Sequence, residues 1–297
     1  MGSGGWTRDD FVTYSTSKGR GVSPQGICTT DSLQDFYRQT SLHKDLNPKN
    51  VIRECCDSEE HPNTVPVILA LDVTGSMRRA CLRTAQELNR IMTSLYDEIT
   101  DVEFLVMGIG DLAYDKAPIQ ASQFESDVRI AENLDKIYME HGGGGNFYES
   151  YTAAWYFGLN HTKLDCWKRG KKGIIITMGD ESLNPYLPRE ELANVLGDIT
   201  WQDDGNIETK PLYELAKDKY DIYHIAINDS GCRYEHHKER IHKTWGNFLG
   251  QDFYVSTLED LSKTIKNCIM DSIAKSDTIY TATPIIPFDT QTGYISW

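Results

Sequence analysis

The chain has 297 residues, of which 39% are hydrophobic and 25% are charged, and its formal net charge is -14. This length suits one large α/β domain or a medium domain with extensions, and the composition is that of a soluble globular protein rather than a disordered or fibrous one. An acidic chain lacks the positive surface that binds nucleic acid or an anionic membrane, so we expect neither as a partner. An acidic surface does suit the binding of cations.

The cysteines and the N-terminus indicate a cellular compartment. The 7 cysteines are odd in number and contain no C-x-x-C pair, a pattern typical of reduced thiols in a cytosolic protein. The first residues, MGSGGWTRDDF, include no apolar segment of the kind found in secretory signals. No run approaches the roughly 18 apolar residues that a membrane helix needs. The sequence therefore predicts a cytoplasmic protein.

In chain order, residues 1–63 are polar and weakly periodic, which predicts a mostly irregular N-terminal arm with one short helix over 31–42. Residues 64–277 then alternate between apolar runs and helical periodicity, as expected for a single folded domain. Strands are predicted at 65–71, 101–110, 172–179, 220–227 and 252–256. Helices are predicted at 76–99, 124–140, 147–159, 236–250 and 258–275, and near 188–197 and 208–218. A Thr- and Pro-rich tail is predicted over 278–297.

The predicted strands are near-continuous runs of Val, Ile and Leu, and they alternate with helices. This pattern favours an α/β fold with a doubly wound, mostly parallel central sheet and helices on both faces, as in Rossmann-like domains. Ligands of such sheets bind at the carboxyl ends of the strands. Asp72 directly follows the first predicted strand, so we expect it at that edge.

Three oxygen-bearing side chains follow this strand at alternate positions, namely Asp72, Thr74 and Ser76. Alternation along an extended segment points side chains to the same side. One carboxylate and two hydroxyls form a set of hard oxygen ligands, which suits Mg²⁺ or Mn²⁺, whereas the absence of soft ligands disfavours zinc. The stretch therefore predicts a divalent metal site.

Asp-x-Thr-x-Ser after a buried strand, with Gly75 and Met77 in the same turn, resembles the metal-ion-dependent adhesion site (MIDAS) of von Willebrand factor A (vWA) domains. By element order the resemblance covers roughly residues 65–275, and it is to the stand-alone bacterial or phage type. It implies a vWA-like domain over 64–277 that binds a protein or peptide. Thr74 and Ser76 would bind the ion directly, and the partner would present a carboxylate to the metal.

The second loop of the resemblance, 141-HGGGGNFYESY-151, lacks the threonine that the family places there. Asn146 has a carbonyl oxygen and could take its place as a metal ligand, and Glu149 is the other candidate. The alternative for Glu149 is that it only marks the start of a helix. The glycines permit a tight turn and a close approach to an ion.

The third loop, 175-IITMGDES-182, places an aspartate two positions later than the family's Thr-Asp-Gly. We assign the family's third-loop role to Asp180, with Glu181 as the near alternative. Asp111 ends the second predicted strand at the same edge and could orient metal-bound waters, although an aspartate in a loop more often makes a turn.

The same residues also resemble Mg²⁺-dependent phosphotransferases of the haloacid-dehalogenase type, in which Asp72 would be the nucleophile. Lys171 or Lys172 would neutralise charge, and the stretch 179–184 would hold the metal. Against this, Thr74 stands where most such enzymes place a second, acid/base aspartate. Ser76 has no role in that scheme, and no cap insertion follows the strand. We therefore predict a binding module and not an enzyme.

Overall fold

The computed structural model describes residues 4–99, 101–140, 148–202 and 204–282. Its central sheet has six strands in the order β10-β9-β6-β2-β3-β4. The strands are β2 (Val65–Asp72), β3 (Val102–Ile109), β4 (Ile119–Ala121), β6 (Gly173–Gly179), β9 (Tyr220–Ile227) and β10 (Phe253–Ser256). All neighbours are parallel except β3 and β4. Numbered within the sheet, this is the order 3-2-1-4-5-6 of Rossmann-type folds.

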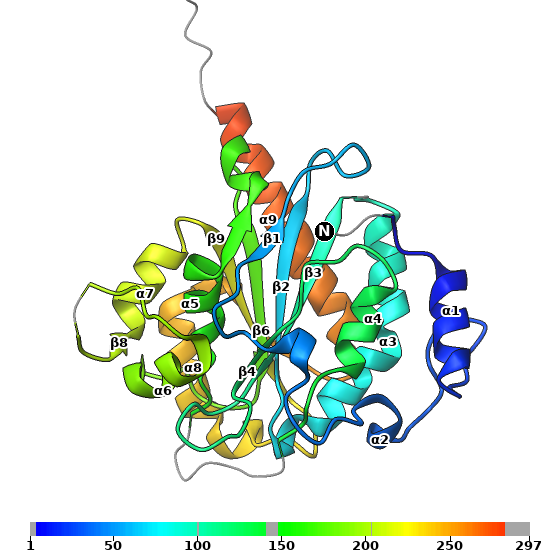
Figure 1. Cartoon of the computed structure of the whole chain (residues 1–297), viewed down its shortest axis with the longest axis horizontal. Helices are drawn as coiled ribbons and strands as arrows, with labels where there is room; N and C mark the ends of the chain where they lie inside the picture. The colour runs from blue at the N-terminus through cyan, green and yellow to red at the C-terminus, as the bar shows by residue number, and fades with distance from the viewer. Residues whose placement is uncertain (1–3, 100, 141–147, 203, 283–297) are drawn as a thin grey trace, which may run out of the picture.

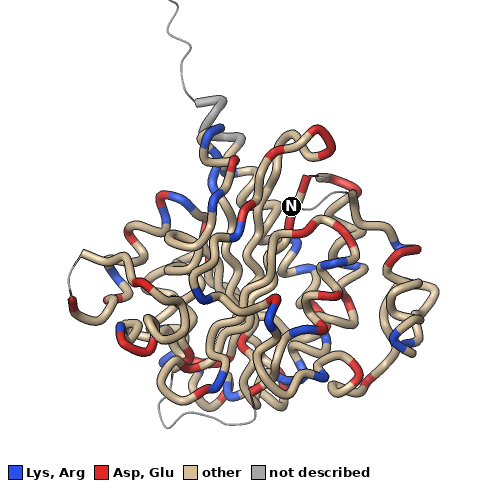
Figure 2. The backbone as a smooth tube through the Cα atoms, viewed as in Figure 1, with Lys and Arg blue, Asp and Glu red and all other residues tan. Residues whose placement is uncertain are grey.

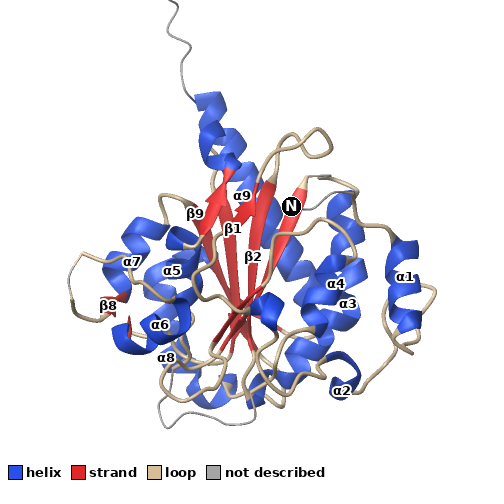
Figure 3. Ribbon diagram, viewed as in Figure 1, coloured by secondary structure: helices blue, strands red, loops and turns tan. Residues whose placement is uncertain are grey.

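Helices cover both faces of the sheet (Figures 1 and 3). One face carries α3 (Arg78–Tyr96), α4 (Arg129–Asp135) and α9 (Leu261–Ala282). The other carries α5 (Ala153–Asn160), α6 (Arg189–Leu196), α7 (Thr209–Ala216) and α8 (Tyr234–Leu249). The predicted α/β fold, doubly wound around a mostly parallel sheet in the vWA/Rossmann-like manner, is confirmed.

The alternation of side chains along β2 explains why both faces must be covered. Val67, Leu69 and Leu71 pack into the core on the α3 side, whereas Ile68 and Ala70 pack into the core on the α5 side. Each fully buried Val, Leu or Ile side chain contributes about 1.5–3 kcal/mol. A strand that is buried on both faces holds its last residue, and thus the loop after it, in a fixed position.

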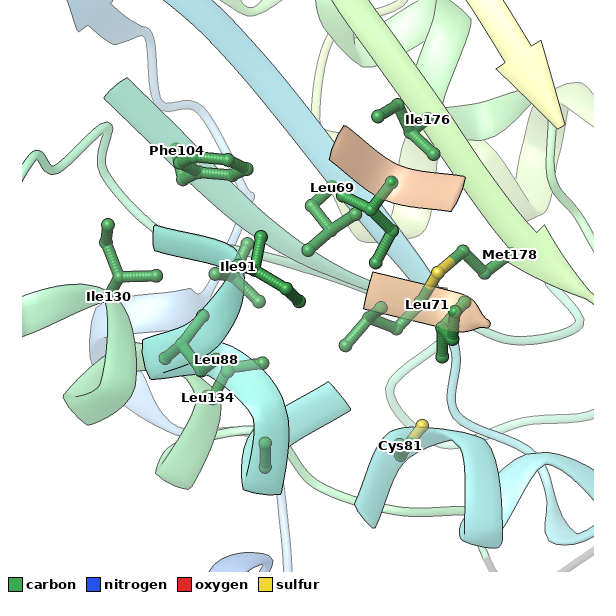
Figure 4. Packing of buried hydrophobic residues seen from close by; sticks show 14 of the residues in the cluster. Leu69, Leu71, Cys81, Leu88, Ile91, Phe104, Ile130, Leu134, Ile176 and Met178 are labelled. Carbon is green, nitrogen blue, oxygen red and sulfur yellow. The ribbon is translucent and has the colours of Figure 1, made fainter. Parts of the chain in front are cut away.

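Figure 4 shows the layer on the α3 side, where Leu69 and Leu71 of β2 face Leu88 and Ile91 of α3. The buried residues of α3 recur at helical spacing, so one side of this helix is apolar along its length. The short 3-10 helix η2 (Gly75–Met77) connects β2 to α3. The loop with the candidate ligands is therefore held between a central strand and a long buried helix.

Further short elements lie outside the central sheet. The N-terminal arm contains α1 (Arg8–Ser17) and α2 (Leu33–Phe36), and two small sheets pair β1 (Arg53–Cys55) with β5 (Thr162–Leu164) and β7 (Tyr186–Leu187) with β8 (Ile207–Glu208). Three further 3-10 helices are η1 (Lys44–Leu46), η3 (Asp165–Arg169) and η4 (Gly250–Asp252). The sequence analysis predicted neither α1 nor the four short strands, nor β4.

The unpredicted helix α1 is fixed by local and tertiary contacts. Its N-cap residue Thr7 accepts a hydrogen bond from the Asp10 backbone N–H at 3.1 Å. Before it, Trp6 is buried and donates from Nε1 to Asn89 of α3 at 3.0 Å. The arm is thus packed against the domain along this segment.

The helix predicted over 31–42 is wrong in extent, because α2 has only 4 residues. Tyr37 leaves the helical conformation, with φ -102° and ψ 81°, and its hydroxyl donates to the backbone carbonyl of Cys81 at 2.9 Å. Phe36 is buried beneath the Arg20 guanidinium, which lies 4.1 Å from the ring centroid. Contacts with the rest of the protein therefore override the local helical preference.

The helix predicted over 124–140 is also shorter in the structure, where α4 has 7 residues. At its start, Glu125 pairs with Phe104 of β3 as an antiparallel bridge, so the backbone is extended there. At its end, Tyr138 exchanges hydrogen bonds with the Gln120 side chain, which hold the backbone out of the helix. Similarly, α5 begins later than predicted because Tyr148 forms a bridge with Ser182.

The C-terminal helix α9 runs to Ala282. The tail predicted over 278–297 therefore overlaps α9, and its remainder lies outside the described residues. Among the residues that the structure describes, no helix combines the length and apolar character that crossing a membrane requires. The 7 cysteines form no disulfide.

Candidate functional site

The first candidate loop begins where β2 ends. Asp72 is the last residue of β2, and its Oδ1 accepts two hydrogen bonds from Thr74, one from the backbone N–H at 2.9 Å and one from the hydroxyl at 2.6 Å. Thr74 is extended, with φ -77° and ψ 172°, and precedes η2. The extended conformation turns the Thr74 side chain back toward Asp72, as the alternation of the sequence predicts.

The third candidate loop lies beside the first, because β6 is the neighbour of β2 in the sheet. Asp180 directly follows β6, and its Oδ1 accepts a hydrogen bond from the Ser76 hydroxyl at 3.1 Å. Its other oxygen, Oδ2, accepts from the Arg233 backbone N–H at 2.6 Å. The structure therefore brings Asp72, Thr74, Ser76 and Asp180 together at the carboxyl edge of the sheet.

Two residues that the sequence analysis missed complete this arrangement. The Tyr151 hydroxyl donates to Asp72 Oδ2 at 2.7 Å and accepts from the Glu181 backbone N–H at 3.4 Å. Tyr151 is fully buried, and its ring and the Trp245 ring pack edge to face with their centroids 5.6 Å apart. Arg233 is the N-cap residue of α8, at the end of the loop that follows β9.

The remaining candidates line the same edge but differ in their contacts. Glu181 accepts a hydrogen bond from the Arg233 guanidinium at 2.9 Å. Asp111 accepts from the Ala113 backbone N–H at 2.8 Å. Within the described residues, one buried oxygen of Glu149, of Asp111 and of Glu181 has no hydrogen-bond partner. Asn146, predicted as a metal ligand, lies outside the described residues.

The site concentrates buried carboxyl groups. Burial raises the pKa of Asp72, and the nearby Asp180 raises that pKa further. Burial likewise raises the pKa of Asp180, against the opposing hydrogen bonds from Arg233 and Ser76. Burial and then Asp72 raise the pKa of Glu149. The charged forms of these carboxyls are thus disfavoured by the protein itself, and a bound cation would favour them.

The donor set is compatible with a divalent ion. A hydroxyl that donates its proton still has two lone pairs, so Thr74 and Ser76 can hydrogen-bond to the aspartates and coordinate a metal at the same time. Carboxylate and hydroxyl oxygens are the ligands that Mg²⁺ and Mn²⁺ prefer. No three His, Cys, Asp or Glu side chains within the described ranges form a metal-holding group. A metal here would therefore depend on the hydroxyls.

The lysines of the phosphotransferase interpretation lie at the wrong end of the sheet. Lys171 and Lys172 precede β6, whereas Asp180 follows it. A strand of this length separates its ends by roughly 20 Å, at about 3.3 Å per residue. Lys172 instead donates to the Lys217 backbone carbonyl at 2.6 Å. The structure does not support this alternative, because Lys171 and Lys172 fall on the opposite edge of the parallel sheet from Asp180.

No protein-family description and no curated protein matches the sequence. Solved structures that the chain resembles include the pilus adhesin SpaC from Lactobacillus rhamnosus GG in its open conformation, at 14% identity and a TM-score of 0.47. The match covers 77% of this chain and 31% of SpaC, so this chain spans about a third of that protein.

Two further structures are similar over nearly their whole length. The vWF domain of the type V pili tip protein Mfa5 from Porphyromonas gingivalis is 13% identical, with a TM-score of 0.43 and coverage of 78% of this chain and 98% of that one. The conserved hypothetical protein BatB from Bacteroides thetaiotaomicron is 14% identical, with a TM-score of 0.41 and coverage of 71% and 99%. These likenesses concern the fold alone.

Proposed function

We propose that this protein is a binding module that takes up Mg²⁺ or Mn²⁺ at a MIDAS-type site and binds a protein or peptide through it. The observation that carries the proposal is the pair of hydroxyl–carboxylate contacts, Thr74 to Asp72 and Ser76 to Asp180, side by side on adjacent loops. The surrounding buried carboxyls support it, because a divalent ion would neutralise the negative charge of their ionised forms.

The roles of the residues follow from their chemistry. Thr74 and Ser76 would coordinate the ion through hydroxyl oxygens. Asp72 and Asp180 would accept the hydroxyl protons and balance the charge of the ion, directly or through water. Glu149 would supply a further oxygen ligand for the ion at the same edge of the sheet. The bound ion supplies an electrophilic position for a carboxylate of the partner, and this role requires no nucleophile and no general base.

Thermal unfolding with and without millimolar Mg²⁺ tests the proposal. A ligand at 100 times its Kd stabilises the folded state by about 2.7 kcal/mol, so the wild type should show a clear increase in Tm. Asp72→Ala should abolish this increase. Asp97→Ala is the matched control, since Asp97 is exposed at the opposite end of α3 and should leave the increase intact.

Two results would contradict the proposal. An unchanged Tm of the wild type in millimolar Mg²⁺ and Mn²⁺ would exclude the metal site. Turnover of a generic phosphate ester, or capture of beryllofluoride on Asp72, would show a phosphotransferase instead. If the metal shift is present, a metal-dependent pull-down that compares wild type with Asp72→Ala then searches for the partner.

A further inference from the structure

A hollow lies beside the candidate metal site. Its volume is about 340 Å³, and its lining includes Asp111, Glu149, Tyr148 and Tyr186. It borders the metal site through Ser150, which lies between Glu149 and the Tyr151 that contacts Asp72. A volume in this range is typical of sites that enclose a small ligand or a side chain.

The hollow continues over α6 into a wider depression of about 780 Å³. The two share Tyr186, Pro188 and Glu191, so they adjoin, and together we name them the acidic groove. The residues that line the outer depression belong to α6 and to the segment before β8, and both elements lie at the lower left of Figure 1. Two adjoining hollows suit an extended segment of a partner rather than a compact metabolite.

The ionisable side chains that line the inner hollow are all acidic. Asp111, Glu149 and Glu191 line the inner hollow, and among the described residues no Lys, Arg or His does so. The outer depression adds Glu190 and Asp204 and one basic residue, Arg189. Figure 2 shows acidic positions beside a basic one at the start of α6. Complementary charge on a partner would therefore be positive.

Two of these carboxylates are buried and incompletely bonded. Asp111 is 4% exposed and Glu149 is 6% exposed, and each has one oxygen without a hydrogen-bond partner in the part of the chain that the structure describes. Both line the inner hollow. A buried carboxylate oxygen without a donor is costly, so a cationic donor that enters the hollow would be favoured.

The walls of the hollow suit the stem of a long basic side chain. Tyr186 is 43% exposed, and Pro185 and Pro188 lie beside it. Lys and Arg pack their methylene groups along apolar surface while the charged end reaches a carboxylate, and a guanidinium also stacks on aromatic rings. The carboxylates and the walls of the inner hollow thus both suit a long basic side chain.

We propose that the acidic groove binds an extended segment of the partner and takes an Arg or Lys side chain into the inner hollow, where it meets Asp111 and Glu149. The partner would then carry a basic residue close to the residue that reaches the metal. That the partner also carries a carboxylate bound to the metal rests on the proposed function. That the partner carries a basic side chain rests on the acidic groove alone.

Fluorescence anisotropy with labelled pentapeptide pools tests the proposal on the full chain. The pools carry Arg, Lys or citrulline at the central position and uncharged residues elsewhere, and citrulline is the uncharged counterpart of arginine. In Mg²⁺ and near-physiological salt, the Arg or Lys pool should bind at least tenfold more tightly than the citrulline pool. Asp111→Asn and Glu191→Gln should each reduce this preference at least fivefold, whereas Glu259→Gln, an exposed residue outside the groove, should not.

The outcomes separate the two proposals. Equal binding of the three pools, or no binding at millimolar protein, would overturn the acidic groove even if Mg²⁺ still stabilises the fold. A preference for Arg or Lys that persists in Asp72→Ala would support the groove and show that it acts without the metal. If Asp111→Asn removes a Mn²⁺ site and no pool is preferred, the carboxylates hold an inorganic cation and the proposal fails.

Discussion

At the scale of single residues, the candidate site depends on how Asp72 is held. This carboxylate is fully buried, and it accepts hydrogen bonds from Thr74 on one oxygen and from Tyr151 on the other. Burying a charge without such donors would cost several kcal/mol. Tyr151 therefore acts as a positioning residue for Asp72 rather than as a ligand.

Tyr151→Phe removes one donor from Asp72 and should lower the free energy of unfolding by about 1–3 kcal/mol, because a buried polar group loses its partner. The measurement is urea unfolding in metal-free buffer. Tyr14→Phe is the matched control, since the Tyr14 hydroxyl donates to Asp135 at 2.6 Å and that carboxylate also pairs with Arg20 at 2.9 Å. An equal loss in both variants would contradict the role given to Tyr151.

At the scale of elements, the ends of neighbouring strands and the start of α5 meet in a confined space. Gly179 is the last residue of β6, and a Cβ atom built on it would lie 1.9 Å from the Tyr151 hydroxyl. The close approach of β6 to Tyr151 is what allows this ring to reach Asp72. The absence of a side chain at Gly179 thus contributes to the site.

Gly179→Ala should displace Tyr151, destabilise the protein by about 1–3 kcal/mol or more, and weaken the Mg²⁺-dependent increase in Tm. Gly246→Ala is the control, because a Cβ atom there meets nothing within 4 Å and alanine favours the helix α8. Thermal unfolding with and without Mg²⁺ measures both variants. An unaltered Tm and metal response in Gly179→Ala would show that the packing around Tyr151 is loose.

Part of this arrangement could be predicted from the sequence. The apolar runs of β2, β6 and β9 identify buried parallel strands, so they place Asp72 and Asp180 at one edge. The contact of Tyr151 with Asp72 could not be predicted, because it joins segments 79 positions apart through tertiary packing. Arg233 meets Asp180 through a backbone N–H, which every residue except proline has, so no residue type signals it.

Short helices and strands could not be predicted from the sequence for the same reason. Long elements with a regular pattern, such as α3, need only their own periodicity to be recognised. The short strand β4 and the short helix α4 are set by neighbours instead, and the side chain of Gln120 in β4 holds Tyr138 beyond α4. Such elements carry few residues of their own, so their pattern is weak.

At the scale of the whole molecule, the doubly wound sheet gives the protein a thick core that also contains a titratable group. His224 of β9 is fully buried, and its ring stacks on Trp245 at a centroid distance of 3.7 Å. One ring nitrogen lies 2.8 Å from the Thr177 hydroxyl, and the other has no partner among the described residues. Burial lowers the pKa of His224 well below its usual value.

This lowered pKa should make the fold less stable in mild acid. Below about pH 6.5 the unfolded chain gains a proton at His224 that the folded chain does not bind, so stability is lost as the pH falls. Between pH 7.5 and 5.5 the wild type should lose about 1 kcal/mol more than His224→Phe, which retains an aromatic ring. Chemical unfolding at both pH values measures this, and equal losses in the two proteins would show that His224 is not the group responsible.

The most direct test of the central claim is an anomalous difference map from crystals soaked in Mn²⁺. We expect one Mn²⁺ peak within about 2.3 Å of the Thr74 and Ser76 hydroxyl oxygens. Asp72 and Asp180 should bind this ion directly or through its waters. The same peak should be missing from crystals of Asp72→Ala. No peak at millimolar Mn²⁺, or a peak held by Asp111 and Glu149 without contact to Ser76, would contradict the account.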